Sequence, residues 1–201
     1  MKKYEFTGET KQVGFFGNIT LKRIRATMEF GIIKIGDLGG WIEKEENLSH
    51  KGDAWVWGNA EVYGNAEVYG DAEVYGNAEV YGDAEVYGNA EVYGNAEVWG
   101  NAKVWGNAKV WGNAEVYGNA EVFSISHVLV VGPIGSRNDF TTFFRDKDSE
   151  ITVKCGCFLG KIDKFLEKVC ETHGDSKYAI VYRTAVEIAK QQIDLSEEKQ
   201  A

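Results

Sequence analysis

The middle of the chain is one hexapeptide repeated twelve times, and residues 54–123 read AWVWGN AEVYGN AEVYGD AEVYGN AEVYGD AEVYGN AEVYGN AEVWGN AKVWGN AKVWGN AEVYGN AEVF. Alanine opens every hexad and valine follows two positions later, so these positions share one environment. Residues two apart in an extended segment point to the same side, which predicts that alanine and valine face a common interior. The residue between them, glutamate in nine hexads, is expected to face water.

Glycine followed by asparagine or aspartate links one hexad to the next, as in Gly64-Asn65 and Gly70-Asp71. These residue types adopt positive φ at little steric cost, so the chain can turn a corner every six residues. A short strand and a corner form one side of a prism, and such prisms bury a continuous core only by stacking coil on coil. The period therefore predicts a β-solenoid.

The hexads resemble those of the hexapeptide-repeat left-handed β-helix, in which three hexads form one triangular coil. The shared feature is an aliphatic residue with a small residue four places later, as in Val62 and Ala66. Glycine stands two places after the aliphatic residue here, instead of one as in that family. The resemblance implies a mainly β fold built on a single-stranded, left-handed parallel β-helix.

The same phase can be followed beyond the perfect repeat. Gly36, Ile42 and Leu48 fall on the alanine position, and Val128 keeps the phase until Pro133 interrupts it. The sequence thus predicts three parts: an N-terminal β cap over residues 1–35, a solenoid over 36–131, and a C-terminal domain over 132–201.

The formal net charge is −9, and the repeat alone holds nine Glu and two Asp against two Lys. An acidic shaft disfavours nucleic acid as a direct ligand, because phosphate binding needs Lys and Arg. Three cysteines, an odd number, fit a reducing compartment. No apolar run is long enough to span a bilayer and Met1 opens no leader, so we expect a cytoplasmic protein without membrane contact.

Glutamates eighteen positions apart form columns if three hexads make a coil. One column is uniformly acidic, whereas the second contains Lys103 and the third contains Trp55 and Lys109. The acidic column is either a solvated surface that resists aggregation or a strip on which a basic partner docks. Its residues are Glu61, Glu79, Glu97 and Glu115.

An aromatic residue follows valine in all twelve hexads. Stacked rings stabilise neighbouring coils, and rows of exposed rings are also typical of contact surfaces, so we expect self-association, as a trimer on the family resemblance. Stacking on sugars is a further alternative. The three aromatic columns are Trp57, Tyr75, Tyr93 and Trp111; Tyr63, Tyr81, Trp99 and Tyr117; and Tyr69, Tyr87, Trp105 and Phe123.

Many hexapeptide-repeat proteins are acyltransferases that use a histidine base and a loop protruding from the coils. The perfect repeat contains neither a histidine nor an insertion. His50 falls on an inward phase at the edge of the solenoid, and His127 falls on an outward phase where it is expected at the surface. Acyl transfer is therefore a minor alternative, and we expect no catalytic residue and no cofactor.

Both ends differ from the repeat. Residues 1–35 alternate apolar and polar side chains, which predicts a small β cap over an otherwise open coil. After Pro133, segments 140–145 and 151–157 predict a hairpin followed by two helices, a ββαα unit. The expected inward faces are Ile162, Phe165, Leu166, Val169 and Cys170 on the first helix, and Tyr178, Val181, Tyr182, Ala185 and Ile188 on the second.

Short motifs in both flanks resemble those of repeat proteins common in phages and prophages. That resemblance implies a genomic setting and a host cell cytoplasm, but assigns no activity and no catalytic residue. The motifs are Gly39-Gly40-Trp41-Ile42-Glu43, Gly135-Ser136-Arg137-Asn138-Asp139, Gly156-Cys157-Phe158, Thr172-His173-Gly174-Asp175 and Tyr182.

The C-terminal domain holds two candidate sites. Ser136, Arg137 and Asn138 can form a loop that grips a small anion, with His173 as a further ligand. A plain connector is the alternative for this loop.

The second candidate is a four-ligand zinc site of Cys155, Cys157, Cys170 and His173, two ligands from a strand and two from a helix. Burial of Cys170 in the apolar stripe of its helix is the competing interpretation.

These observations favour a non-enzymatic interaction protein of phage type, a rigid, acidic, self-associating β-helix that binds and blocks a host protein, for example one used in defence. One alternative is a sponge that binds a nucleotide-like molecule through Ser136, Arg137 and His173. Another is a DNA mimic whose Glu61 to Glu115 column inhibits a nuclease or topoisomerase.

Overall fold

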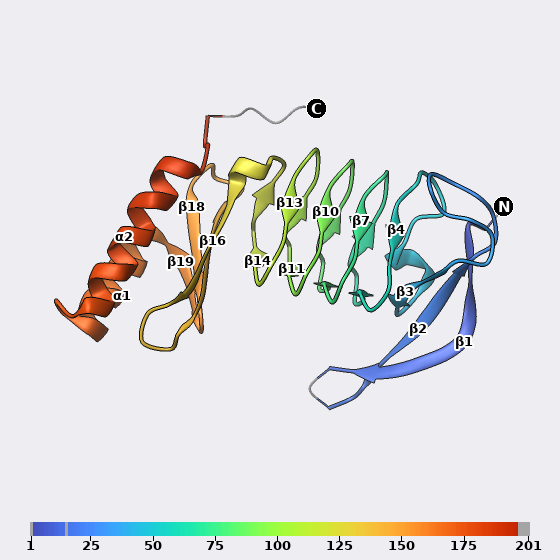
Figure 1. Ribbon diagram of the computed structural model, residues 1–201, viewed down its shortest axis with the longest axis horizontal. Helices are drawn as coiled ribbons and strands as arrows, with labels where there is room; N and C mark the ends of the chain where they lie inside the picture. The colour runs from blue at the N-terminus through green and yellow to red at the C-terminus, as the bar shows by residue number, and fades with distance from the viewer. Residues whose placement is uncertain (1, 15, 197–201) are drawn as a thin grey trace.

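The computed structural model describes residues 2–14 and 16–196, so residues 1, 15 and 197–201 of the two predicted end units lie outside the described residues. Figure 1 shows an elongated molecule with a regular β-solenoid in the middle. A long hairpin projects from the N-terminal end, and a sheet covered by two helices closes the C-terminal end. No helix among the described residues is long and apolar enough to cross a membrane.

The shaft is a parallel β-solenoid of hexapeptide repeats, which confirms the predicted fold. Residues eighteen apart pair in register, as Val62 pairs with Val80. Three faces result, with strand orders β3-β5-β8-β11-β14, β4-β7-β10-β13 and β6-β9-β12-β15. The strands are β3 (Leu38–Ile42), β4 (Trp55–Val56), β5 (Glu61–Val62), β6 (Glu67–Val68), β7 (Glu73–Val74), β8 (Glu79–Val80), β9 (Glu85–Val86), β10 (Glu91–Val92), β11 (Glu97–Gly100), β12 (Lys103–Val104), β13 (Lys109–Val110), β14 (Glu115–Gly118) and β15 (Glu121–Val122).

The interior of the shaft contains the alanine and valine of every hexad, each fully buried. Corner glycines all have positive φ, for example 68° at Gly88, and a Cβ there would lie 3.0 Å from the amide nitrogen of Gly106. The corners therefore need glycine both for conformation and for close stacking. An asparagine ladder runs beside them, since Asn77 Nδ2 donates to Asn95 Oδ1 at 3.2 Å and Asn95 Nδ2 to Asn113 Oδ1 at 3.0 Å.

The N-terminal end is capped by β1 (Tyr4–Val13) and β2 (Ile19–Ala26), an antiparallel hairpin that extends the sheet through β3. Buried Lys3 donates from Nζ to the carbonyl of Ala54 at 2.7 Å, and burial lowers the pKa of Lys3 to about 8. The Tyr4 hydroxyl donates to the carbonyl of Leu48 at 2.9 Å. Both residues thus satisfy carbonyls of the first coils, which have no preceding coil to pair with.

The predicted phase of the first coil is wrong. Ile42 pairs with Val62 and Leu48 bridges to Val68, so both occupy the valine position rather than the alanine position. The 3₁₀ turn η1 (Glu45–Asn47) lies in this coil and explains the shift, because the spacing from Ile42 to Val62 is two residues longer than one regular coil.

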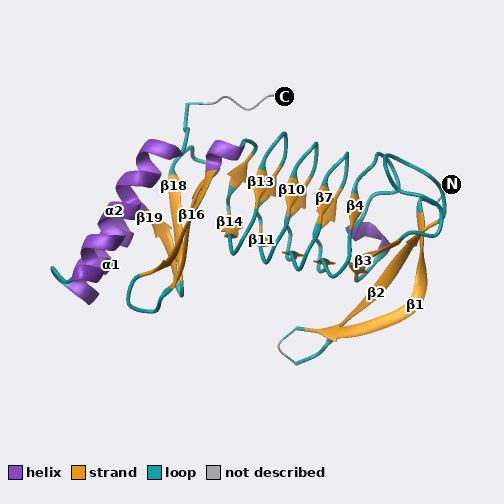
Figure 2. Cartoon of the chain, in the orientation of Figure 1, coloured by secondary structure: helices purple, strands orange, loops and turns teal. Residues whose placement is uncertain are grey.

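The C-terminal domain has four antiparallel strands before its helices, rather than the two of the predicted ββαα unit. Figure 2 shows the helices covering one face of this sheet. The extra strands arise on either side of the predicted hairpin, from residues assigned by sequence to the solenoid end and to a turn. The elements are η2 (Ile125–His127), β16 (Val128–Ile134), β17 (Asp139–Arg145), β18 (Ile151–Cys155), β19 (Phe158–Lys161), α1 (Ile162–His173) and α2 (Lys177–Gln192).

Three further predictions for this end are corrected. His127 is fully buried, with Nδ1 accepting from the Phe123 amide at 3.3 Å, because η2 turns it beneath the first strand of the C-terminal sheet. In α2, Val181 and Ile188 are exposed, whereas the inward face includes Ala179, Val186 and Ala189 beside the correctly predicted Tyr182 and Ala185. Small side chains allow the helix to pack closely, which outweighs the larger apolar residues one step round the helix.

Candidate functional site

The shaft carboxylates are bound by the tyrosines of the preceding coil. Tyr63 Oη donates to Glu79 at 3.0 Å and Tyr81 Oη donates to Glu97 at 3.0 Å. The same bond joins Tyr69 to Glu85 and Tyr75 to Glu91, at 2.9 and 2.8 Å. Of the glutamates at this repeat position, only Glu67 is exposed. The prediction that this position simply faces water is therefore wrong for the others.

The acidic column of Glu61, Glu79, Glu97 and Glu115 forms as predicted by register, on β5, β8, β11 and β14. Both of its ends are neutralised within the chain. Lys11 Nζ lies 2.6 Å from Glu61, and Lys154 Nζ lies 2.5 Å from Glu115. Burial raises the pKa of Glu79 in the middle of the column. The column is thus largely engaged by the protein's own side chains.

The other two faces are paired in the same way. Lys103 Nζ lies 2.6 Å from Glu85, and Lys109 Nζ lies 2.7 Å from Glu91. These lysines stand one coil above the glutamates that they bind, so each ion pair ties two coils together.

The aromatic columns stack along the shaft. Tyr63 and Tyr81 have ring centroids 4.9 Å apart with planes within 1°, and Trp99 lies 4.1 Å from Tyr117. Only Trp111 among the column rings has an exposed side chain, and Tyr117 and Phe123 are buried beneath the C-terminal sheet. The expectation of twelve exposed rings is therefore wrong, because ring-on-ring contact and the end domain cover most of their area.

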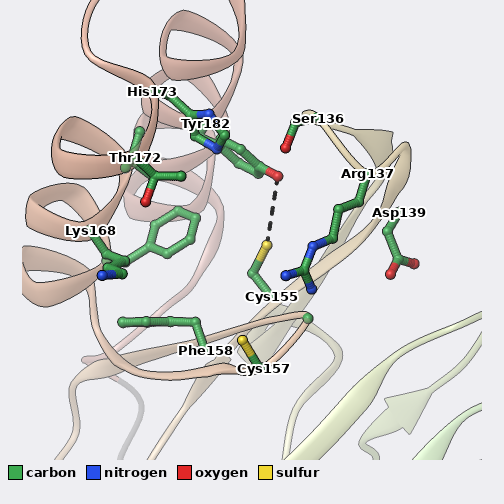
Figure 3. Close-up of a pocket in the computed structure, with 13 residues that line it drawn as sticks. Ser136, Arg137, Asp139, Cys155, Cys157, Phe158, Lys168, Thr172, His173 and Tyr182 are labelled. Carbon is green, nitrogen blue, oxygen red and sulfur yellow. Dashed lines mark hydrogen bonds between the residues drawn. The ribbon is translucent and has the colours of Figure 1, made fainter.

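A cavity of about 280 Å³ opens in the C-terminal domain, where four separate segments meet (Figure 3). The loop after β16, the turn between β18 and β19, the end of α1 and the middle of α2 each contribute. These are the C-terminal segments whose motifs resemble phage repeat proteins. The lining residues are Ser136, Arg137, Asp139, Cys155, Gly156, Cys157, Phe158, Phe165, Lys168, Val169, Thr172, His173 and Tyr182.

Tyr182 organises this cavity from α2. A Cβ at Gly135 would lie 1.8 Å from the Tyr182 hydroxyl oxygen, so the loop can approach the ring only because residue 135 is glycine. The Ser136 amide and the Cys155 thiol, 3.9 Å away, donate toward the same oxygen. Burial, together with Cys155, raises the pKa of Tyr182 to about 12. The hydroxyl stays protonated at neutral pH and keeps its own hydrogen available as a donor.

The charged groups of the cavity are Arg137, Lys168 and Asp139. Within residues 2–14 and 16–196, the exposed guanidinium of Arg137 forms no ion pair. Lys168 pairs with Glu171 at 3.1 Å on the solvent side of α1. Figure 3 shows Arg137 and Lys168 on opposite sides of Phe158. The cavity therefore presents an unpaired cation at one side of an aromatic floor.

The structure brings three of the four residues of the predicted anion site together. Ser136, Arg137 and His173 line the cavity, whereas Asn138 does not, because a left-handed φ of 53° carries the chain through a turn there. The sequence-based site omitted several lining residues. Phe158 and Lys168 carry no local sequence signal of a site, since an aromatic residue in a strand and a lysine on a helix are both commonplace.

The predicted zinc ligands do not come together. Among the described residues no group of three or more His, Cys, Asp or Glu could hold a metal ion. Strand β18 ends at Cys155, and Gly156 with a φ of 55° starts a turn that places Cys157 outside the strand pairing expected of it. Cys170 is exposed and does not line the cavity, which also contradicts the competing prediction that it is buried.

Comparison of the sequence with protein-family models and with curated proteins found no match. The case for a function accordingly depends on the geometry of this chain.

Proposed function

We propose that this chain is a non-enzymatic binding protein whose C-terminal cavity captures a small anionic ligand, with the β-solenoid as its rigid stem. The observation that supports this most directly is the guanidinium of Arg137. It lines a cavity of about 280 Å³ and forms no ion pair within the described residues.

The surrounding groups suit an anion such as a phosphate. A guanidinium offers parallel N–H donors that match two oxygens of a phosphate or carboxylate. The hydroxyls of Ser136 and Thr172 line the same cavity, and the protonated Tyr182 hydroxyl adds a third donor. The Cys155 thiol accepts from the Thr141 hydroxyl at 3.2 Å and donates to Tyr182, so its place in the domain has a structural explanation without chemistry.

Docking of a basic host protein on the Glu61 to Glu115 column has less support. A docking strip needs carboxylates that are free to meet a partner, and these are bound by Tyr63, Tyr81, Lys11 and Lys154. The same observation weakens the DNA-mimic alternative. Trimer formation, the phage setting, the host target and the cytoplasmic location stay predictions from the sequence.

The proposal is tested by isothermal titration calorimetry with ribose 5-phosphate and inorganic phosphate as probes. Arg137→Gln should weaken binding about tenfold or more, because it removes charge-assisted hydrogen bonds worth about 1.5–3 kcal/mol. Arg25→Gln is the matched control, since Arg25 is exposed on β2 far from the cavity. Equal affinities for the two variants, or no binding to the wild type, would refute the proposal.

A second pair of variants locates the site on α1. Lys164 and Lys168 are both exposed and both pair with a glutamate three residues on, at 2.7 and 3.1 Å. Only Lys168 lines the cavity. Lys168→Gln should weaken binding of ribose 5-phosphate by a few-fold through lost long-range attraction, and Lys164→Gln should leave it unchanged. The reverse order would contradict the location of the site.

A further inference from the structure

The geometry of the cavity points to nucleoside monophosphates as the ligand class, with the base stacked on Phe158 and the phosphate on Arg137. This inference depends on the proposed anion site and extends it. No sequence pattern assigned Phe158 a role, and its position in the cavity carries the inference.

Phe158 forms the floor of the cavity. Figure 3 shows its ring edge-on below the open space, so that one face is turned toward the ligand position. The ring is held from the side by Phe165, whose centroid lies 5.3 Å away at an interplanar angle of 53°. Phe165 and Val169 of α1 are buried and make an apolar wall beside it. A flat ring can therefore lie on Phe158 with its edge against this wall.

A simple anion would leave this floor uncovered. Inorganic phosphate on Arg137 makes no use of Phe158, because the guanidinium lies at one side of the ring rather than above its centre (Figure 3). A ligand that uses both groups needs a planar aromatic part joined to an anionic group. Base stacking on aromatic side chains combined with a cation for the phosphate is the usual way that proteins hold single nucleotides.

The size of the cavity limits the ligand to one nucleotide unit. Pockets for drug-sized molecules usually enclose about 300–1,000 Å³, and this cavity of about 280 Å³ lies just below that range. A dinucleotide would also bring a second phosphate, for which the remaining cation, Lys168, is already paired with Glu171. Thr172 and Tyr182 supply hydroxyls for the ribose or the base edge.

The test compares AMP, GMP, CMP and UMP with ribose 5-phosphate, which lacks the base, by calorimetry on the full chain. We expect at least one nucleotide to bind about tenfold more tightly than ribose 5-phosphate, because base stacking is lost without the ring. This comparison needs no variant, so it holds even if a substitution disturbs folding. Equal affinities of all five compounds would overturn the inference and leave the anion site intact.

Phe158→Leu keeps an apolar side chain but removes the ring face. It should weaken the tightest nucleotide about tenfold and leave ribose 5-phosphate unchanged. Phe140→Leu is the control, because Phe140 lies on β17 and does not line the cavity. A loss of both ligands together in Phe158→Leu, with the fold unchanged by circular dichroism, would assign Phe158 a merely structural role. Absence of binding by every compound would instead refute the proposed function itself.

Discussion

The solenoid and the C-terminal domain use polar side chains in opposite ways. In the solenoid, carboxylates, phenols, amides and lysines bind one another from coil to coil, as Tyr81 binds Glu97 and Lys103 binds Glu85. In the C-terminal domain, Arg137, Ser136 and Thr172 line a cavity, and Arg137 has no ion-pair partner in the described residues. Abundant surface chemistry in a repeat is thus compatible with a purely structural role, while the irregular end offers unused donors.

The largest effect should come from a charge in the shaft interior. Val98 is fully buried between coils, whereas Val181 on α2 is 39% exposed. Val98→Asp should lower the free energy of unfolding by more than about 4 kcal/mol, since it buries an unpaired charge, and Val181→Asp should change it by less than about 0.5 kcal/mol. Thermal unfolding followed by circular dichroism measures both. Unchanged stability of the Val98→Asp variant would contradict a dry, continuous core.

High pH should unfold the shaft before ordinary tyrosines would require it. Burial, together with the bound glutamates, raises the pKa of Tyr63, Tyr69, Tyr75 and Tyr81 above the ordinary value of 10. A raised folded-state pKa gives stability that is complete below pH 10 and is lost as pH rises through the folded-state value. Phenolate absorbance and loss of β-structure should therefore rise together above pH 10. Titration of these phenols near pH 10 with the fold intact would contradict the Tyr–Glu bonds.

The junction between the two regions should be more sensitive than the shaft surface. The side chain of Lys154 is 8% exposed and binds Glu115, whereas that of Lys103 is 43% exposed and binds Glu85. Lys154→Gln should cost about 1–3 kcal/mol, and Lys103→Gln less than about 1 kcal/mol. Urea unfolding of the two variants measures the difference. Equal costs would mean that the C-terminal sheet is only loosely seated on the last coil.

The smallest effect separates hydrogen bonding from ring stacking. Tyr81→Phe keeps the ring and removes the hydroxyl that donates to Glu97, which should cost about 1 kcal/mol. Tyr93 is the control: it also stacks, at 4.7 Å from Tyr75, but Lys109 takes the glutamate's place one coil on. Tyr93→Phe should therefore leave the stability unchanged in the same urea experiment, and equal losses in both variants would argue against a role for the hydroxyl bond.

The solenoid could be predicted from sequence because its period sets corner, interior and register by local rules. The same rules failed at the first coil, where two extra residues moved Ile42 and Leu48 to the valine position. The outward phase of a strand also does not distinguish a side chain in water from one bound by its neighbour. For that reason the Tyr–Glu bonds and the low exposure of most column rings were not expected.

The cavity could be predicted only in part. The loop motif indicated Ser136 and Arg137, and the end of α1 indicated His173, because glycine, arginine and histidine in loops and at helix ends have recognisable chemistry. Phe158 and Lys168 come from elements whose positions depend on tertiary packing. The zinc prediction failed for a similar reason, since the turn at Gly156 separates Cys157 from the strand on which the spacing placed it.

Hydrogen–deuterium exchange of the full chain with and without AMP tests most directly whether binding is confined to the irregular end. The account predicts slower exchange in peptides covering residues 134–140, 154–160, 168–174 and 180–184, with no change in peptides from the repeat at residues 54–112. Protection along the shaft, or unchanged exchange throughout at saturating AMP, would contradict it.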